Sequence, residues 1–447
     1  MSHEQAPHPV IRCCLYVLLL APLLALQLLF DRSASGWVIG LYMFSFLPYL
    51  LIYKWWRTPG ALKEALLVGV LIRILLLPTT PTLSDDYFRY AWDGQLQVND
   101  INPYSYRPSE LIHPTDVSTS NGSLDTALYH QLNSKDYFSI YPPAAQALFY
   151  VTAAAAGNDL NLQLLLLKLL LFLPELLVIL LLPGLLGRMG IAPYQSLLYL
   201  LNPLVIVELT GNIHMESAMI SFSFLALYFF SHQKLYVAAI MLGIALSFKF
   251  NILLLFPLLL LPLSFKKAIP FIAVAGITFI AGFLFYLNLE TVTHIFKSIG
   301  LYFHTFEFNA GAFNLYRLGG PLTYIVRDIF RLLFPIATVA LLVLFSLRSQ
   351  VNTIASLAVW VLGCYLLLSP TVHPWYITPL LFLSIFTSIR FPFLWSFLLP
   401  LSYAAYATTA YTESMWLIAI EYIVVWTAVA LEWKKERMSL FARASHS

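Results

Sequence analysis

The sequence is poor in charged residues: aspartate, glutamate, lysine and arginine make up only 11% of its 447 residues, whereas hydrophobic residues make up 60%. Soluble domains carry about 25% charged residues, so this chain has too little polar surface to cover a water-soluble globule. Cysteine is scarce as well, and Cys13, Cys14 and Cys364 all lie in apolar runs, which indicates neither a disulfide framework nor a zinc cluster. The composition excludes a soluble globule, a disordered chain and a disulfide scaffold.

The sequence also lacks a basic patch and the common nucleotide-binding and hydrolase motifs, which excludes further classes of function. The net charge of +3 comes from scattered basic residues, which form no patch for nucleic acid, so we expect no nucleic-acid partner. The chain also lacks Gly-x-Gly-x-x-Gly, Gly-Lys-Ser/Thr, Gly-x-Ser-x-Gly and His-Glu-x-x-His. These missing motifs argue against soluble-type enzyme chemistry attached to a membrane anchor.

Long apolar runs dominate what is present. A spanning helix needs about 20 mostly apolar residues, because the hydrocarbon layer is roughly 30 Å thick. The sequence therefore predicts an all-α polytopic membrane protein, a single integral membrane domain over residues 1–447 with about 12–14 transmembrane helices. The candidate spans lie near residues 10–30, 37–53, 63–78, 162–186, 193–210, 214–231, 235–248, 251–264, 268–288, 326–347, 352–369, 374–389, 391–409 and 412–433.

Lysine and arginine predict which connections face the cytoplasm, because positive residues are enriched there. Placing them inside gives one consistent path, with both termini in the cytoplasm. The extracytoplasmic side then receives a long first loop with juxtamembrane helices and catalytic acids at 79–161, a turn at 210–216, a second loop at 289–323 and a turn at 369–374, while 432–447 is a cytoplasmic tail. Within the first loop, residues 142–156 are interpreted as a helix that lies along or dips into the outer face.

The first loop is acidic: residues 79–136 hold eight of the 22 acidic residues of the chain, together with several aromatic residues. Ser84 is a suitable N-cap for a helix, and Gly94 is placed to help end it. Asp85 lies four residues before Arg89, and one face of this helix would carry, at spacings of three and four, Asp86, Arg89, Tyr90 and Asp93. The alternative interpretation is a capped surface helix with internal ion pairs.

Few other polar residues lie at membrane depth. They are Asn202, Glu208, Asn212, His214 and Glu216 around one turn, Lys249 in an apolar run, and His373 in the last outer turn. An ionisable group in a span costs at least about 2.5–3.5 kcal/mol on insertion scales, so it usually faces a cavity or a partner. The topology places most of these groups beside the loop acids, which predicts an outward-facing polar cavity. Structural pairing is the alternative for each, and we expect it for Arg73, Glu175 and Glu208.

A cavity at the membrane–water boundary suits a substrate with one polar end and one lipid end. Carboxylates beside basic groups fit the transfer of a sugar from a phospholipid. One carboxylate would take the proton of the attacking hydroxyl, and cationic side chains would hold the phosphate as it leaves.

Several motifs carry a family resemblance, in this order: Ser84-Asp85-Asp86 through Trp92-Asp93-Gly94, Ile101-Asn102-Pro103-Tyr104, Tyr141-Pro142-Pro143, Gly211-Asn212-Ile213-His214, Lys249, Phe308-Asn309 and His373-Pro374-Trp375-Tyr376. With them the chain resembles the GT-C superfamily of integral membrane glycosyltransferases, and within it the polyprenol-phosphate-mannose-dependent mannosyltransferases. The resemblance implies a GT-C-like helical bundle and an inverting transfer of a hexose, with mannose expected, from a polyprenyl-phosphate donor to a hydroxyl of a glycan or glycolipid acceptor.

The resemblance also implies site residues. The general base falls on Asp86 or Asp85, of which Asp86 fits the Asp-Tyr spacing better. The donor phosphate would be bound by Arg89, Lys249 and His373, and the sugar or acceptor by Asp93, Tyr104, Tyr141, Asn212, His214, Glu216, Asn309, Trp375 and Tyr376. No cofactor is expected, and the adjacent aspartates do not indicate a metal.

The location that we expect is the bacterial inner membrane, with the active site on its extracytoplasmic face; the endoplasmic reticulum is the alternative. The rival function is a secondary transporter or a flippase of a lipid-linked sugar. Such proteins usually show two similar halves with broken helices, and the sequence shows no second loop that mirrors 79–161.

Overall fold

The computed structural model describes residues 7–111, 124–255, 258, 260, 262–329, 354–408 and 411–444. Within these residues every regular element is a helix, and the strand-like pairing is a single bridge between Phe308 and Thr371. This confirms the predicted all-α class.

Five of the described helices are long and apolar enough to cross a membrane, and a sixth span results if one bent pair is counted. The five are α1 (Pro9–Leu28), α2 (Ser35–Trp55), α8 (Leu160–Arg188), α14 (Phe265–Phe283) and α20 (Met415–Ala444). They confirm a polytopic membrane protein. The larger predicted number of spans stays a prediction, because other predicted spans are short or broken helices and the span predicted at 326–347 lies mostly outside the described residues.

The remaining bundle helices are shorter. They are α3 (Pro59–Leu76), η1 (Pro193–Ser196), α9 (Leu197–Leu200), α12 (Leu235–Leu246), η3 (Phe250–Leu255), η4 (Gly311–Leu322), α17 (Ile354–Leu368), η5 (Pro374–Ile377), α18 (Thr378–Ser384), α19 (Phe391–Leu398) and η6 (Leu399–Tyr406). Inside the bundle Arg73 and Glu175 form a fully buried ion pair of 2.8 Å, which confirms the packing contact expected for these two residues.

The chain bends sharply where the sequence predicted a turn between two spans. A helix formed by α10 (Pro203–Val205) and the π-helical η2 (Ile206–Gly211) meets α11 (Glu216–Ser231) at 111°. In the break Ile213 has a φ of +58°, a conformation that β-branched residues rarely adopt. Such backbone strain costs about 1–3 kcal/mol and, like π turns, is concentrated at functional sites. Full burial of Ile213 in the bundle holds it in place.

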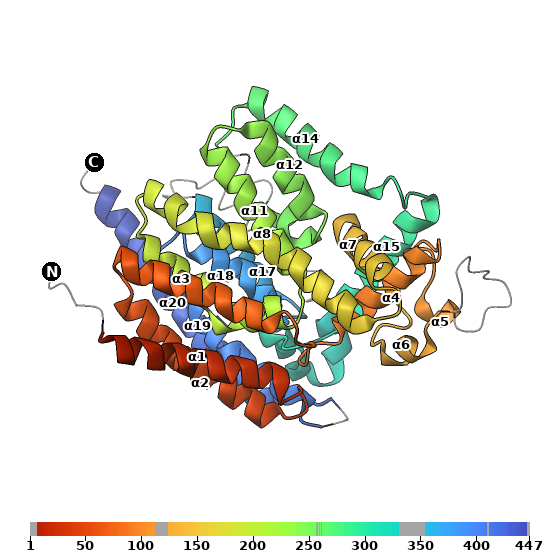
Figure 1. Ribbon diagram of the computed structural model, residues 1–447, viewed down its shortest axis with the longest axis horizontal. Helices are drawn as coiled ribbons and strands as arrows, with labels where there is room; N and C mark the ends of the chain where they lie inside the picture. Colours follow the sequence, from red (N-terminus) through yellow and green to blue (C-terminus); the bar gives the residue numbers. More distant parts are fainter. Residues whose placement is uncertain are drawn as a thin grey trace.

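The helices of the two polar loops gather at one end of the molecule (Figure 1). They are α4 (Asp86–Val98), α5 (Pro108–Leu111), α6 (Thr126–Gln131), α7 (Pro143–Ala156) and α15 (Leu289–Thr305). At the opposite end of the long axis α1 begins and α20 ends (Figure 1). The predicted topology requires this arrangement, since it puts the loops and the termini on different sides. Helix α20 continues through the predicted tail to Ala444.

Helix α4 differs from its prediction at both ends. Its N-cap is Asp85 rather than Ser84, although the Ser84 hydroxyl accepts a hydrogen bond of 3.3 Å from the Asp86 amide. The prediction that Gly94 helps to end the helix was wrong, because α4 continues to Val98. A side chain at Gly94 would collide with the carbonyl oxygen of Phe149 on α7. Gly94 therefore permits a close approach of α4 and α7, which fixes the position of the acidic face.

Candidate active site

A polar cavity of about 240 Å³ opens beside the first turn of α4. Four stretches of the chain, far apart in sequence, bring eight of the predicted site residues to it: Asp85, Asp86, Arg89, Tyr141, Lys249, His373, Trp375 and Tyr376. Arg32 and Tyr406 also line it. The predicted convergence on one cavity is therefore present, and the roles of the residues in it stay predictions.

The two adjacent aspartates have different surroundings. Asp85 forms an ion pair with Arg32, not with Arg89 as its spacing suggested. No lysine or arginine of the described residues pairs with Asp86: its carboxylate lies 4.0 Å from the Nδ1 atom of His214 and is 24% exposed. Burial raises the pKa of Asp86 above its ordinary value, an effect that the positive charge of Lys249 partly opposes. Asp86 is the better placed of the two to exchange a proton.

Arg89 is held by three partners and keeps one group unused. Its Nε atom donates to Asp93 at 2.7 Å, and its Nη1 atom donates to the carbonyl oxygens of Ser134 (3.1 Å) and Tyr137 (2.9 Å). The Nη2 atom is buried and has no hydrogen-bond partner among the described residues. Since a buried unpaired donor is costly, this atom suits an anion bound in the cavity.

Asp93 holds Arg89 in place through their ion pair. Its second carboxylate oxygen accepts hydrogen bonds from Ser139 (2.5 Å) and Gln146 (2.8 Å), and the side chain is fully buried. The spacing of Arg89 and Asp93 on one helical face is confirmed as an ion pair. The predicted contact of Asp93 with sugar is not supported, because its oxygen atoms already have protein partners and it does not line the cavity.

Lys249 brings a cation into the cavity from the end of α12. Its Nζ atom lies 3.1 Å from Glu216 and faces the rings of Tyr141 and Tyr376, at 5.7 and 6.0 Å from their centroids. Glu216 itself is fully buried behind the lysine. Glu216 therefore holds Lys249 in place, and the sugar contact predicted for it is not supported by its position.

Four rings form a continuous stack along one wall of the cavity. His214 stacks on Trp375 at 3.7 Å, Trp375 on His373 at 4.4 Å, and His373 on Phe308 at 4.6 Å. Burial lowers the pKa of His373 to about 3, so this imidazole is neutral and can offer a hydrogen bond rather than a charge. Its Nδ1 atom has no hydrogen-bond partner among the described residues.

Four other predicted contact residues lie outside the cavity. Tyr104 donates a hydrogen bond of 2.5 Å to the carbonyl oxygen of Tyr141 and so supports the cavity wall. Asn212 and His214 are fully buried in the break between η2 and α11. Asn309 donates to Glu421 on α20 at 3.0 Å. These side chains are paired or packed inside the protein, and their contact with sugar stays a prediction.

Sequence reasoning missed Arg32 near the site and named Glu208 only as a packing contact. Arg32 lies in the short turn between α1 and α2, which the predicted topology puts on the same side as the acid loop, and that signal was available. Glu208 was expected to be a packing contact. It does accept hydrogen bonds from Tyr42 (2.8 Å) and Tyr403 (2.7 Å), but its other oxygen lies 3.5 Å from His214.

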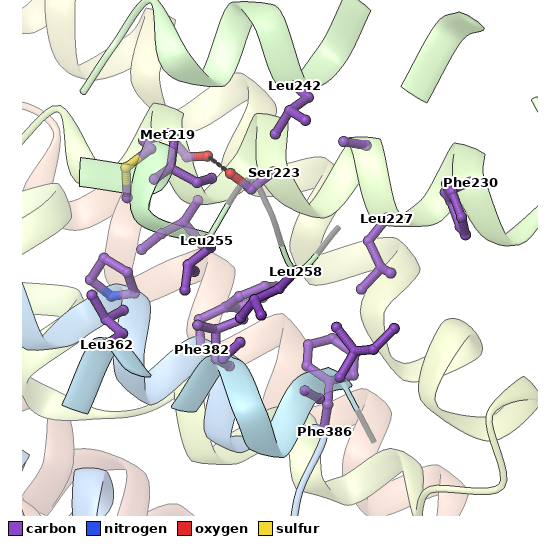
Figure 2. A pocket seen from close by; sticks show the side chains of 18 of the residues that line it. Met219, Ser223, Leu227, Phe230, Leu242, Leu255, Leu258, Leu362, Phe382 and Phe386 are labelled. Carbon is purple, nitrogen blue, oxygen red and sulfur yellow. Dashed lines mark hydrogen bonds between the residues drawn. The ribbon is translucent and has the colours of Figure 1, made fainter. Parts of the chain in front are cut away.

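A larger, apolar cavity of about 460 Å³ lies among the bundle helices (Figure 2). Helices α11, α12, α17 and α18 surround it with leucine, phenylalanine and methionine side chains, including Met219, Leu242 and Phe382 (Figure 2). Two chain segments reach both cavities: Lys249 is followed by Asn251, and Tyr376 by Pro379. The two cavities together offer a polar and an apolar compartment.

Within the part of the chain that the structure describes, no group of three or more histidine, cysteine, aspartate or glutamate side chains could hold a metal ion.

A family model described as alpha-(1->6)-mannopyranosyltransferase, N-terminal domain, matches residues 20–264, more than half of the chain. The chain belongs to this family. It is a GT-C family of mannosyltransferases, so the predicted resemblance is confirmed and the chain is a membrane glycosyltransferase. No curated protein and no solved structure matches it. The region matched to the mannopyranosyltransferase family contains Asp86, Arg89 and Lys249 but ends before His373.

Proposed function

We propose that this family member transfers mannose from a polyprenyl-phosphate donor to a hydroxyl of a glycan or glycolipid acceptor, with inversion at the anomeric carbon and Asp86 as general base. The observation that carries the proposal is the shared cavity. An aspartate that pairs with no lysine or arginine of the described residues, an arginine with an unused buried donor and a lysine line the same 240 Å³ space.

Each of these groups has a chemical task in such a transfer. The acceptor oxygen attacks the anomeric carbon while the bond from that carbon to the phosphate oxygen breaks, and a single displacement inverts the configuration. Asp86 takes the proton of the acceptor hydroxyl. The polyprenyl phosphate leaves with the bonding electrons, and Arg89 and Lys249 stabilise its growing negative charge. Asp85 cannot easily share the task of Asp86, because Arg32 holds it.

The apolar cavity supports a lipid-linked donor. Because the segments after Lys249 and Tyr376 pass directly from the polar to the apolar cavity, a phosphate held at Lys249 would lie close to an apolar compartment. Burying hydrocarbon there is worth roughly 25 cal/mol per Å² of surface removed from water. The proposal places the first isoprenyl units of the donor in this cavity.

Charge and shape support the proposed side of the membrane. The basic connections predict that the termini face the cytoplasm, and the loop helices lie at the other end of the molecule (Figure 1). We place the polar cavity at the extracytoplasmic face, in the bacterial inner membrane, with the endoplasmic reticulum as the alternative.

The test is a transfer assay with detergent-solubilised protein and polyprenyl-phosphate-linked mannose, glucose or arabinose. We expect transfer from the mannose donor, lost in Asp86→Asn and retained in Asp85→Asn. Full transfer by Asp86→Asn would remove the proposed base, and transfer from another lipid-linked sugar alone would remove mannose.

One observation favours the rival function, a flippase or transporter: the break between η2 and α11 resembles the discontinuous helices of transporters. Transporters usually repeat such a break in a second half, and the described residues contain one bent pair. Movement of the lipid-linked sugar across proteoliposomes, without any glycosylated product, would favour the rival.

A further inference from the structure

His214 lies between two carboxylates, one on each side of its ring. Its Nδ1 atom is 4.0 Å from Asp86, and its Nε2 atom is 3.5 Å from Glu208. The side chain is fully buried, and neither nitrogen has a hydrogen-bond partner in the described structure. An imidazole that served only for packing would leave two buried polar atoms unpaired, which is costly.

Glu208 is fixed on the side away from the cavity. Tyr42 and Tyr403 both donate to its Oε1 atom, at 2.8 and 2.7 Å, and Asn212 donates to its Oε2 atom at 3.4 Å. These bonds aim the Oε2 atom toward His214. The π-helical turn that carries Glu208 and the strained Ile213 just before His214 place the two side chains face to face.

Trp375 stacks on one face of the His214 imidazole. The two rings are 3.7 Å apart and within 15° of parallel. An indole face attracts a cation that lies over it. The environment of His214 therefore contains two carboxylates and an aromatic face, all of which stabilise an imidazolium.

We propose that His214 and Glu208 form a proton relay behind Asp86, in which His214 is a positioning residue that receives the proton of the acceptor hydroxyl through Asp86. The inference rests on the proposed function, since it takes Asp86 as the base. It also reassigns His214 from sugar binding, for which it is too deeply buried.

The proton transfers of this relay balance, and they need no co-reactant. The acceptor O–H bond breaks and a proton moves to Asp86. The Asp86 O–H bond then breaks while an Nδ1–H bond forms on neutral His214, which becomes an imidazolium between two carboxylates. After the product leaves, the proton returns through Asp86 to water in the cavity. A separation of 4.0 Å is compatible with this, because catalytic hydrogen bonds are often long without substrate and shorten in the reacting complex.

Charged groups surround both Asp86 and His214. Those that influence Asp86 are His214, Lys249, Glu216 and Asp85, and those near His214 are Asp86, Glu208 and His373. The relay works only while His214 is neutral and Asp86 is a carboxylate, so the acid limb of the kcat profile reports the first proton taken up by this pair. In His214→Asn only Asp86 is left to take up that proton, and the acid limb should then move to lower pH.

The test compares His214→Asn, Glu208→Gln and the double variant with the parent in the transfer assay. We expect each single variant to lower kcat by roughly 10- to 100-fold, less than the loss of a general base, with KM within about twofold. The acid limb of His214→Asn should move to lower pH. Because the two residues act as a unit, the double variant should be no worse than the slower single variant. The exposed residue His130 on α6 supplies the control, and His130→Asn should match the parent.

The outcomes separate the two proposals. If Asp86→Asn is inactive while His214→Asn and Glu208→Gln keep the parental kcat and pH profile, the relay is wrong and the proposed base survives. If Asp86→Asn keeps full transfer, Asp86 is not the base, and the proposed base and the relay behind it both fail. Should His214→Asn be poorly folded, Glu208→Gln decides, because the glutamine oxygen can still accept from Tyr42 and Tyr403; an unchanged kcat in that variant overturns the relay.

Discussion

Arg32 holds Asp85, and this ion pair separates two aspartates that are adjacent in the sequence. The guanidinium also lies over the ring of Tyr406, 4.7 Å from its centroid. With one negative charge engaged by Arg32, Asp86 is left to face the cavity from the start of α4. A pair that looks symmetric in the sequence thus has one member bound at the cavity edge and one exposed to a substrate.

The first prediction concerns pH. A general base must be deprotonated, so a raised pKa of Asp86 places the acid limb of kcat above the ordinary range of an aspartate. Asp85 raises this pKa and Lys249 lowers it. Asp85→Asn should therefore move the acid limb to lower pH and Lys249→Met to higher pH. The measurement is kcat against pH at saturating donor, and shifts of the same sign in both variants would contradict the assignment.

The second prediction concerns stability. Because the folded protein raises the pKa of Asp86, folding favours the protonated acid, and stability falls as the pH rises from the unfolded-state pKa through the folded-state pKa. Above the folded-state pKa, Asp86 is charged in the folded protein, and the full free-energy cost of burying its carboxylate lowers the stability. Asp86→Asn removes this cost and should unfold at the same or a higher temperature than the parent at pH 7. A clearly lower Tm in detergent would show that the carboxylate stabilises the fold.

The third prediction tests the contact of α4 with α7. Gly94→Ala would place a methyl group against the Phe149 carbonyl and 2.9 Å from the Ala153 side chain. Such overpacking costs typically about 1–3 kcal/mol, and it would shift the acidic face of α4, so transfer should fall with stability. In the matched control, Gly276→Ala on α14, the new methyl group meets nothing within 4 Å. Equal effects of the two variants would contradict the proposed close approach.

The fourth prediction concerns the support of Arg89. Asp93→Asn removes the charge partner of a buried guanidinium, and breaking such a pair costs about 3–5 kcal/mol. We expect a large loss of stability and poor expression. The exposed pair of Arg107 and Glu110 is the control, because Glu110→Gln should cost no more than about 1 kcal/mol. If Asp93→Asn kept its stability and only raised KM for the acceptor, the sugar contact predicted from the sequence would be restored.

The sequence predicted those features that depend on local spacing. Arg89 and Asp93 are four residues apart, so their pairing on one helical face could be foreseen, as could the helical class from the apolar runs. Pairings between distant segments could not. Arg32, in the turn between α1 and α2, forms an ion pair with Asp85 at the start of α4. Asn309 donates a hydrogen bond to Glu421 on α20. The role of Glu208 depends on a π turn and a strained residue that no apolar pattern signals.

The last prediction tests the apolar cavity as the place of the donor lipid. Ala226 on α11 is a small residue in its wall, so Ala226→Phe would fill part of the space that the first isoprenyl units are proposed to occupy. We expect a higher KM for a long-chain donor and a smaller change for a donor with a short, truncated tail, because only the long chain needs the lost volume. Ala273→Phe on the exposed side of α14 is the size-matched control and should change neither KM. An equal rise for both donors would indicate a distorted bundle, and no rise for either would place the lipid tail elsewhere.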